Sequence, residues 1–257
     1  MITRRQFLAG SAGAFAALSG LSLFSQYGLI NSIAKSIPIL LYHRVGPEGD
    51  PLTITISRFQ QDMETLSQEN YTPLSLTQLK RHMLSPNEPL PAKPIVLTFD
   101  DGYLDNYTNA FPVLQKYSMK ASFEIITGMV GEPNRMTIPQ IREMEAAGMD
   151  FGSHTVTHRP LGELTYKEAT TELIKSKADL EQIIGKPVDF IAYPCGSYTS
   201  ETVNIARQAG YVGGLSTHDG FALIKDAMAI RRIPIFHCDR SISYVMFRKG
   251  FLPFIFS

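Results

Sequence analysis

The chain has 257 residues, of which 44% are hydrophobic and 19% are charged, and its 24 basic residues balance its 24 acidic ones. This length fits one large domain or two small ones, and the apolar share is that of a folded globular protein and excludes a disordered one. A neutral balance without a clustered basic excess gives no sign of a nucleic-acid or anionic-membrane partner.

The first 34 residues differ in character from the rest of the chain. Paired arginines precede a long run of small and apolar residues that carries no charge. The stretch TRRQFL at 3–8 resembles a twin-arginine export signal, and residues 32–34 are small enough for a signal peptidase site. We therefore expect a signal segment at 1–34 and a single domain at 35–257, exported to the periplasm or cell envelope. The apolar run is near the ~20 residues that span a bilayer, so an uncleaved inner-membrane anchor is the alternative.

Short apolar runs alternate with amphipathic stretches from Ile37 onward. The apolar runs are typical of strands buried on both faces and lie at 37–45, 94–99, 120–127, 149–153, 188–194, 211–217 and 229–236. The amphipathic stretches repeat apolar residues at helical spacing and lie at 57–66, 76–83, 105–117, 137–147, 165–184, 200–209 and 241–249. Ser57 is the expected cap of the first helix.

Alternating strands and helices with buried strands require a parallel sheet covered by helices. At this length the choice is a barrel or a doubly wound sheet. No G-x-G-x-x-G follows an early strand, which weakens the dinucleotide-binding version of the second fold. In a barrel, the chemistry lies at the carboxyl ends of the strands. Polar residues collect at these ends, at Tyr42-His43, Asp100-Asp101, Ser153-His154, Tyr193-Pro194 and His237.

Two histidines and two aspartates in this set suggest a metal site. His154 and His158 can supply two ligands of a catalytic zinc, which commonly takes three protein ligands and leaves a position for water. Thr155 occupies the place of the general-base glutamate of zincins, so the base must lie elsewhere. Asp100 and Asp101 can divide the remaining tasks, one binding the metal and the other abstracting a proton. A plain Asp-Asp-Gly turn is the alternative.

Several stretches carry a family resemblance. PIVLTFDDGY (94–103), GMDFGSHTVTH (148–158) and IAYPCGSY (191–198) resemble the first three motifs of the polysaccharide deacetylases, carbohydrate esterase family four. PILLYHRV (38–45) resembles the opening strand of one branch, and the likeness covers nearly everything from 37 to 235. It implies a single-domain distorted (β/α) barrel of about seven parallel strands with a divalent metal, often zinc. It also implies hydrolysis of N-acetyl groups on amino-sugar polymers, or in some members of O-acetyl groups on other glycans.

The resemblance assigns roles by position. Asp100 would be the general base, and the metal ligands would be Asp101, His154 and His158. The AYPCG stretch would line the substrate groove through Tyr193, Pro194 and Cys195, with the Cys195 backbone N–H as an oxyanion donor. We expect His43 at the rim, in contact with substrate or with a neighbouring loop.

This chain also departs from the family pattern. The arginine that begins the third motif is replaced by Ala192, and we expect Arg232 on a later strand to hold the base instead. Glu124 stands where this branch often has a second phenylalanine, and the tryptophan motif is absent because the chain has no Trp. The late Leu-x-His pattern is matched loosely by His237, which is either the general acid or a plain loop residue.

The resulting expectation is a metal-dependent hydrolase that deacetylates N-acetylglucosamine-type units of an envelope or exported polysaccharide. The alternatives are an O-acetyl glycan esterase and a glycan-binding or assembly protein with little turnover. Cys195 and Cys238 are expected to be isolated thiols, with a disulfide as the alternative. The tail at 247–257 is expected to pack across the barrel, and a peripheral membrane contact is the less favoured alternative.

Overall fold

The computed structural model describes residues 36–253 except 48, 86–88 and 223–225. The chain divides into two units, Met1–Ser36 and Ile37–Ser257. The expected signal or anchor segment lies outside the described residues, as does the end of the tail. Among the helices that the structure describes, none is long and apolar enough to cross a membrane.

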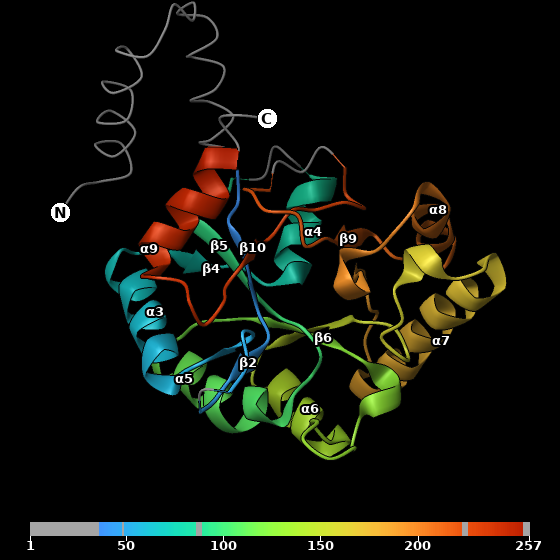
Figure 1. Ribbon diagram of the computed structural model, residues 1–257, viewed down its shortest axis with the longest axis horizontal. Coiled ribbons are helices and arrows are strands. Elements are labelled where there is room, and N and C mark those ends of the chain that lie inside the picture. Colours follow the sequence, from blue (N-terminus) through green and yellow to red (C-terminus); the bar gives the residue numbers. More distant parts are fainter. Residues whose placement is uncertain (1–35, 48, 86–88, 223–225, 254–257) are drawn as a thin grey trace, which may run out of the picture. The chain divides into compact units, whose positions relative to one another are not determined.

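The main sheet is parallel and curls into a half-barrel, with helices on its outside (Figure 1). The strand order is β10 (Ile233–Pro234), β1 (Ile39–Tyr42), β5 (Pro94–Phe99), β6 (Ser122–Ile125), β7 (Asp150–Ser153), β8 (Phe190–Ala192) and β9 (Gly213–Leu215). A parallel bridge between Leu215 and Ile230 links β9 to the chain just before β10. Short β4 (Thr72–Pro73) pairs with β5, and β2 (Arg44–Val45) pairs with β3 (Thr53–Ile54). The predicted barrel of about seven parallel strands is confirmed.

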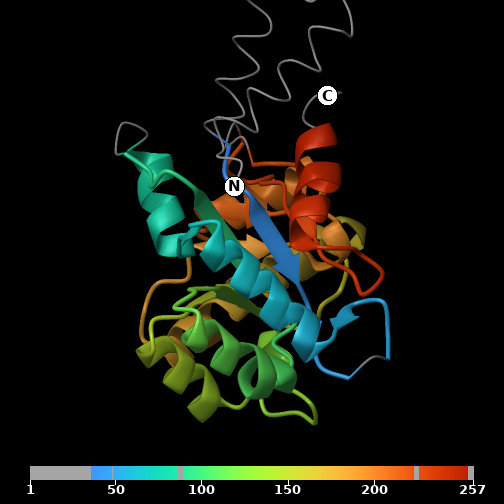
Figure 2. The same ribbon diagram turned by 90° about the vertical axis from the view of Figure 1, so that its left-hand side faces the viewer.

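The helices follow the strands as predicted. They are α3 (Ile56–Gln68), α4 (Leu76–Leu84), α5 (Phe111–Lys116), α6 (Ile138–Ala146), α7 (Tyr166–Ile184), α8 (Ser200–Gln208) and α9 (Ile242–Val245). Figure 2 shows α3 alongside β1. π-Helical turns at Asn106–Ala110 and Met246–Phe251 adjoin α5 and α9. Pro112 has no N–H for the helical ladder, which accounts for the irregular start of α5.

Several predicted boundaries were wrong, and three of these differences have a clear physical reason. The cap of α3 is Thr55 and not Ser57, because extended Thr55 accepts a hydrogen bond from the Arg58 N–H. The first strand stops at Tyr42, since its partner β5 ends one residue before the Asp100 turn. The last strand is shorter than 229–236, and Pro234 within it cannot donate to a ladder.

Side chains alternate between the two faces of the sheet, and this alternation positions the site. On the outer face, aromatic rings of neighbouring strands stack in one row with centroids 4.9–5.8 Å apart, namely Tyr42, Phe99, Phe123 and Phe151. The register pairs each ring with the next. The residues that follow these four therefore form one row on the inner face, namely His43, Asp100, Glu124 and Gly152.

The inside of the barrel has an apolar layer and a polar layer. The apolar layer holds side chains of β1, β5, β8 and β9 together with Leu76 and Leu79 of α4. The polar layer is buried and includes Glu124 of the inner row together with Thr98, Ser122, Ser216 and Arg232. Buried polar groups are costly unless they find partners, so this layer indicates a specific electrostatic arrangement.

Candidate active site

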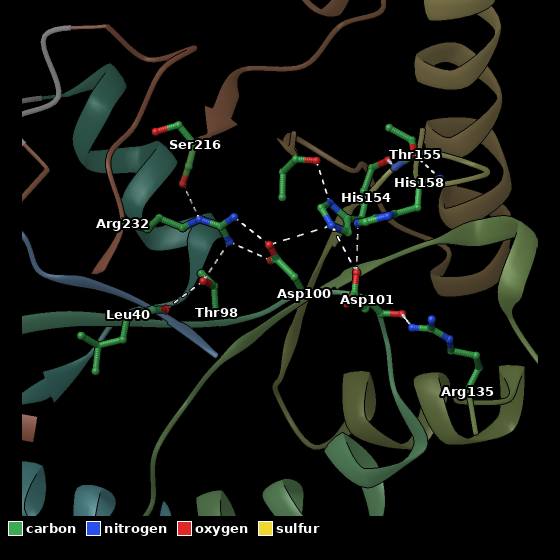
Figure 3. Close-up of polar contacts among 12 residues, drawn as sticks. Leu40, Thr98, Asp100, Asp101, Arg135, His154, Thr155, His158, Ser216 and Arg232 are labelled. Carbon is green, nitrogen blue, oxygen red and sulfur yellow. Dashed lines mark hydrogen bonds and ion pairs between the residues drawn. The ribbon is translucent and has the colours of Figure 1, made fainter. Parts of the chain in front are cut away.

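The three predicted metal ligands come together beyond the ends of β5 and β7 (Figure 3). Asp101 follows β5, and His154 and His158 follow β7. Asp101 Oδ1 lies 3.4 Å from His154 Nε2 and 3.3 Å from His158 Nε2. One carboxylate oxygen and two imidazole nitrogens therefore face a common point.

The geometry of these three residues fits a single divalent cation. Two ligand atoms at about 2.1 Å from a tetrahedral zinc would stand about 3.4 Å apart. Asp101 Oδ1 is buried and has no hydrogen-bond partner among the described residues. His154 Nδ1 lies 2.8 Å from the Ala192 carbonyl oxygen. Because a carbonyl only accepts, Nδ1 carries the proton, and Nε2 is left to bind a metal.

Charge keeps the Asp101 carboxylate ionised. Burial raises the pKa of Asp101, but the neighbouring imidazoles of His154, His43 and His158 outweigh burial and hold that pKa well below its usual range. Burial lowers the pKa of His154, but the charges of Asp100 and Asp101 prevail and raise it. Burial and the nearby His154 lower the pKa of His158. An ionised carboxylate beside imidazoles is the electrostatic environment that a cation requires.

Asp101 is held in an uncommon backbone conformation. Its φ is 76°, in the left-handed region, and that of Gly102 is 66°. A non-glycine residue keeps this conformation only where its surroundings enforce it. Arg135 Nη1 donates to the Asp101 carbonyl oxygen at 2.6 Å, and the Met136 N–H donates to the Gly102 carbonyl oxygen at 3.0 Å. The segment around Arg135 therefore fixes the turn that carries Asp101.

Asp100 is bound on the inner side by Arg232. Arg232 Nη1 and Nη2 donate to the two carboxylate oxygens at 2.7 Å each, and Arg232 is fully buried. Arg232 also donates to Thr98 Oγ1 at 3.2 Å and to the Ser216 carbonyl oxygen at 2.9 Å. Burial raises the pKa of Asp100, but the charge of Arg232 more than offsets burial and lowers it. The expected contact between Arg232 and the carboxylate is present, and it holds an ionised carboxylate 3.9 Å from His154 Nε2.

The two other histidines of the predicted site, His43 and His237, differ in their surroundings. His43 lies in the inner row, and its imidazole interacts with the charges of Asp100 and Asp101. Burial lowers the pKa of His43, and its buried Nδ1 has no hydrogen-bond partner in the part of the chain that the structure describes. His237 lies after β10, where its N–H donates to the Pro51 carbonyl oxygen. Among the contacts of the described residues, none joins His237 to the carboxylates.

The third motif lies beside the site, which it contacts through the Ala192 carbonyl oxygen at His154 Nδ1. Tyr193 is fully buried, and its hydroxyl donates to the Met228 carbonyl oxygen at 2.9 Å. Pro194 is also buried. Cys195 is exposed, with a left-handed φ of 56°. Cys195 and Cys238 are both free, which agrees with the favoured expectation of isolated thiols. Substrate contacts of these residues stay predictions.

Glu124 was noted in the sequence as a departure from the family pattern but was not among the predicted site residues. It is fully buried in the inner row, and a Cβ on its partner Gly152 would lie 1.8 Å from Glu124 Oε2. Ser122 Oγ donates to Oε1, whereas none of the described residues forms a hydrogen bond with Oε2. Burial and the charge of Asp100 raise the pKa of Glu124 to about 8. The alternation along β6, which puts Glu124 on the same face as Ser122, is the signal that could have revealed it.

The raised pKa of Glu124 predicts a pH-dependent stability. The folded state holds the Glu124 proton up to about pH 8, whereas an unfolded glutamate loses it near 4.5. The stabilising contribution is therefore full below pH 4.5 and is lost as pH rises through 8. We expect Glu124→Gln to reduce the fall in the free energy of unfolding between pH 5 and pH 9 by roughly 4 kcal/mol in urea titrations. The exposed Glu201→Gln is the control, and equal pH slopes in wild type and Glu124→Gln would refute the argument.

The fold and the site together define an α/β barrel protein with a candidate metal-dependent active site at its strand ends. Comparison with known proteins narrows this class. Residues 87–214 match the family model described as polysaccharide deacetylase. The Bacillus subtilis protein YxkH, named as a polysaccharide deacetylase, is 34% identical over 200 residues, which are 77% of this chain and 71% of that one. The chain therefore belongs to the polysaccharide deacetylase family.

Two further relatives add structural and chemical context. The structure of the Streptococcus pyogenes deacetylase PplD in complex with acetate has a TM-score of 0.75 and 33% identity, over 79% of this chain and 93% of that one. Poly-β-1,6-N-acetyl-D-glucosamine N-deacetylase of Staphylococcus aureus MRSA252 is 31% identical over 143 residues. This match spans about half of each chain, 50% of this one and 49% of the relative.

Proposed function

We propose that this protein is a metal-dependent hydrolase that removes acetyl groups from N-acetylglucosamine-type units of an envelope or exported polysaccharide. The convergence of Asp101, His154 and His158 on one point, beside an ionised Asp100, supports this proposal above all. A binding module would have no need of a buried, arginine-held carboxylate next to metal ligands. The N-deacetylase activity for which the Staphylococcus aureus relative is named supports an N-acetyl substrate.

The chemistry divides between a cation and the side chains around it. A divalent cation held by Asp101, His154 and His158 would lower the pKa of a water ligand to about 7 and polarise the acetyl carbonyl. Asp100 accepts the proton of the attacking water, because Arg232 keeps its carboxylate ionised and oriented. The Cys195 backbone N–H is the proposed additional donor to the carbonyl oxygen as negative charge develops there.

The departing amine then needs a proton. Asp100 holds the proton that it took from water, and His43 lies in the same inner row within the field of both carboxylates. These two groups can return a proton to the leaving nitrogen. His237 stays a predicted alternative donor. The proposed location is the periplasm or cell envelope, with residues 1–34 as a twin-arginine signal or an uncleaved anchor, since polysaccharides of this kind lie outside the cytoplasm.

Acetate release tests the proposal. The purified protein is incubated with β-1,6-linked N-acetylglucosamine oligomers, chitin oligomers and an O-acetylated glycan, with and without a chelator and then with added zinc. We expect acetate from an N-acetyl substrate, loss with chelator and recovery with zinc. His154→Ala should lower the rate at least about 100-fold.

His82→Ala is the matched control, because His82 lies in the last turn of α4 and not in the site. Release from the O-acetylated glycan alone would favour the esterase alternative. Release from none of the substrates, with zinc bound, would favour the glycan-binding alternative and contradict the proposed activity.

A further inference from the structure

The loop between the two histidines has a strained backbone. Thr155 has a φ of 66° and His158 a φ of 62°, both in the left-handed region. Neither residue is glycine, so each conformation must be enforced by neighbouring groups. The direction of the His158 imidazole depends on this loop, because His158 is a part of it. The loop therefore determines whether the second imidazole reaches the point shared with Asp101.

The carboxylate of Glu172, on α7, binds this loop through hydrogen bonds. Its Oε2 accepts hydrogen bonds from the Val156 N–H at 2.8 Å and the Thr157 N–H at 2.9 Å. Its Oε1 accepts one from Thr157 Oγ1 at 2.6 Å. All three bonds go to Val156 and Thr157, which lie between the two histidines. One carboxylate thereby accepts from both backbone N–H groups of Val156 and Thr157 and from the Thr157 hydroxyl.

The position of Glu172 on its helix is unusual for a charged residue. It lies in the buried stripe of α7 with Ala169, Leu173 and Leu180, and it is 7% exposed. A carboxylate in such a position is costly unless hydrogen bonds compensate for lost water. An apolar side chain would pack there without this cost. A specific task for the carboxylate is therefore the economical explanation.

A second contact fixes the loop from the side of β6. The Gly128 N–H donates to the Val156 carbonyl oxygen at 3.0 Å, and the Thr127 N–H to the Thr155 carbonyl oxygen at 3.0 Å. A Cβ at Gly128 would lie 2.5 Å from the Val156 oxygen. The backbone N–H groups of 127–128 thus hold the carbonyl oxygens of Thr155 and Val156. Among the described contacts, the N–H groups of Val156 and Thr157 are held by Glu172.

From these contacts we infer that Glu172 is a positioning residue of the metal centre, which preorganises the His154–His158 loop for cation binding. The inference rests on the proposed function, because it takes these histidines as ligands. Glu172 does not touch the ligand atoms; it acts through the backbone that carries them. Removal of the Glu172 carboxylate should weaken cation affinity more than it lowers the stability of the barrel.

Zinc affinity measured by competition with a chromophoric chelator tests this role, with thermal unfolding of the zinc-free protein as a second readout. Glu172→Leu removes both acceptors at similar volume and should weaken zinc binding about 10- to 100-fold. Glu172→Gln can still accept both backbone N–H groups and donate to Thr157 Oγ1, so it should bind within about threefold of wild type. If Glu172→Leu does not fold, Thr157→Val removes the 2.6 Å bond alone and should give a smaller weakening in the same direction.

Glu181→Leu is the matched control. Glu181 is on the same helix and also accepts a backbone N–H, that of Val188, at 2.9 Å, but the segment it holds carries no ligand. It should change unfolding without changing zinc affinity. Equal zinc affinity of wild type, Glu172→Leu and Thr157→Val would overturn the inference, as would equal weakening in Glu172→Leu and Glu181→Leu. If the wild type binds no divalent cation, the proposed function fails with it.

Discussion

Replacement of Asp100 by asparagine is expected to lower kcat for acetate release by about 10³-fold while zinc affinity stays within a few-fold of wild type. Asparagine has the size of aspartate but cannot accept a proton from water. The metal ligands are a different set, Asp101, His154 and His158, so their geometry should persist. Steady-state acetate release and chelator competition, measured on the same preparation, give both quantities.

The matched control for this substitution is Asp105→Asn. Asp105 follows Asp100 by five residues and also pairs with an arginine, Arg44, at 2.8 Å, but it is not among the residues that face the ligands. It should retain most of the activity. If Asp100→Asn keeps activity within threefold of wild type, Asp100 is not the base. If Asp100→Asn also loses zinc, the assignment of Asp100 as base and Asp101 as metal ligand is wrong.

The sequence predicted the barrel because its signals are local and repeat along the chain. Each buried strand is a short apolar run, each helix has its own apolar stripe, and polar residues at strand ends followed from the parallel topology. Boundaries were less accurate where a partner decided them. Thr55 and Ser57 are both good caps, and the structure selects Thr55 because its hydroxyl accepts from the Arg58 N–H, three residues further along the chain.

The candidate site was predictable to the extent that its residues lie in contiguous motifs. The ligand set comes from two such stretches, and Arg232 was expected because Ala192 left the base without a cation. The residues that support the ligands were not predictable in this way. Arg135 binds Asp101 through a carbonyl, and Glu172 binds a loop through N–H groups. Contacts to backbone atoms impose no residue pattern on the loop they hold, so only the folded structure reveals them.

The pairing of Arg232 with Asp100 leads to the prediction with the largest effect on stability. We expect Arg232→Met to lower the free energy of unfolding by about 3–5 kcal/mol and to lower acetate release at least about 100-fold. Removing the guanidinium leaves the buried carboxylate of Asp100 without its compensating charge, so the pKa of Asp100 rises and the base is lost. Urea unfolding at pH 7 measures the first effect.

The double variant Arg232→Met/Asp100→Asn separates pairing from simple packing. Because both charges are then absent, it should be more stable than Arg232→Met alone, although it is equally inactive. Arg231→Met is the control, since Arg231 is the exposed neighbour and, among the contacts of the described residues, donates to the Asp219 carbonyl oxygen at 3.2 Å and not to Asp100. Additive losses in the double variant, or wild-type activity in Arg232→Met, would mean that Arg232 fills space in the barrel and does not hold the base. If adding Asp100→Asn to Arg232→Met raises the free energy of unfolding while the enzyme stays inactive, the buried pair serves catalysis and not the stability of the fold.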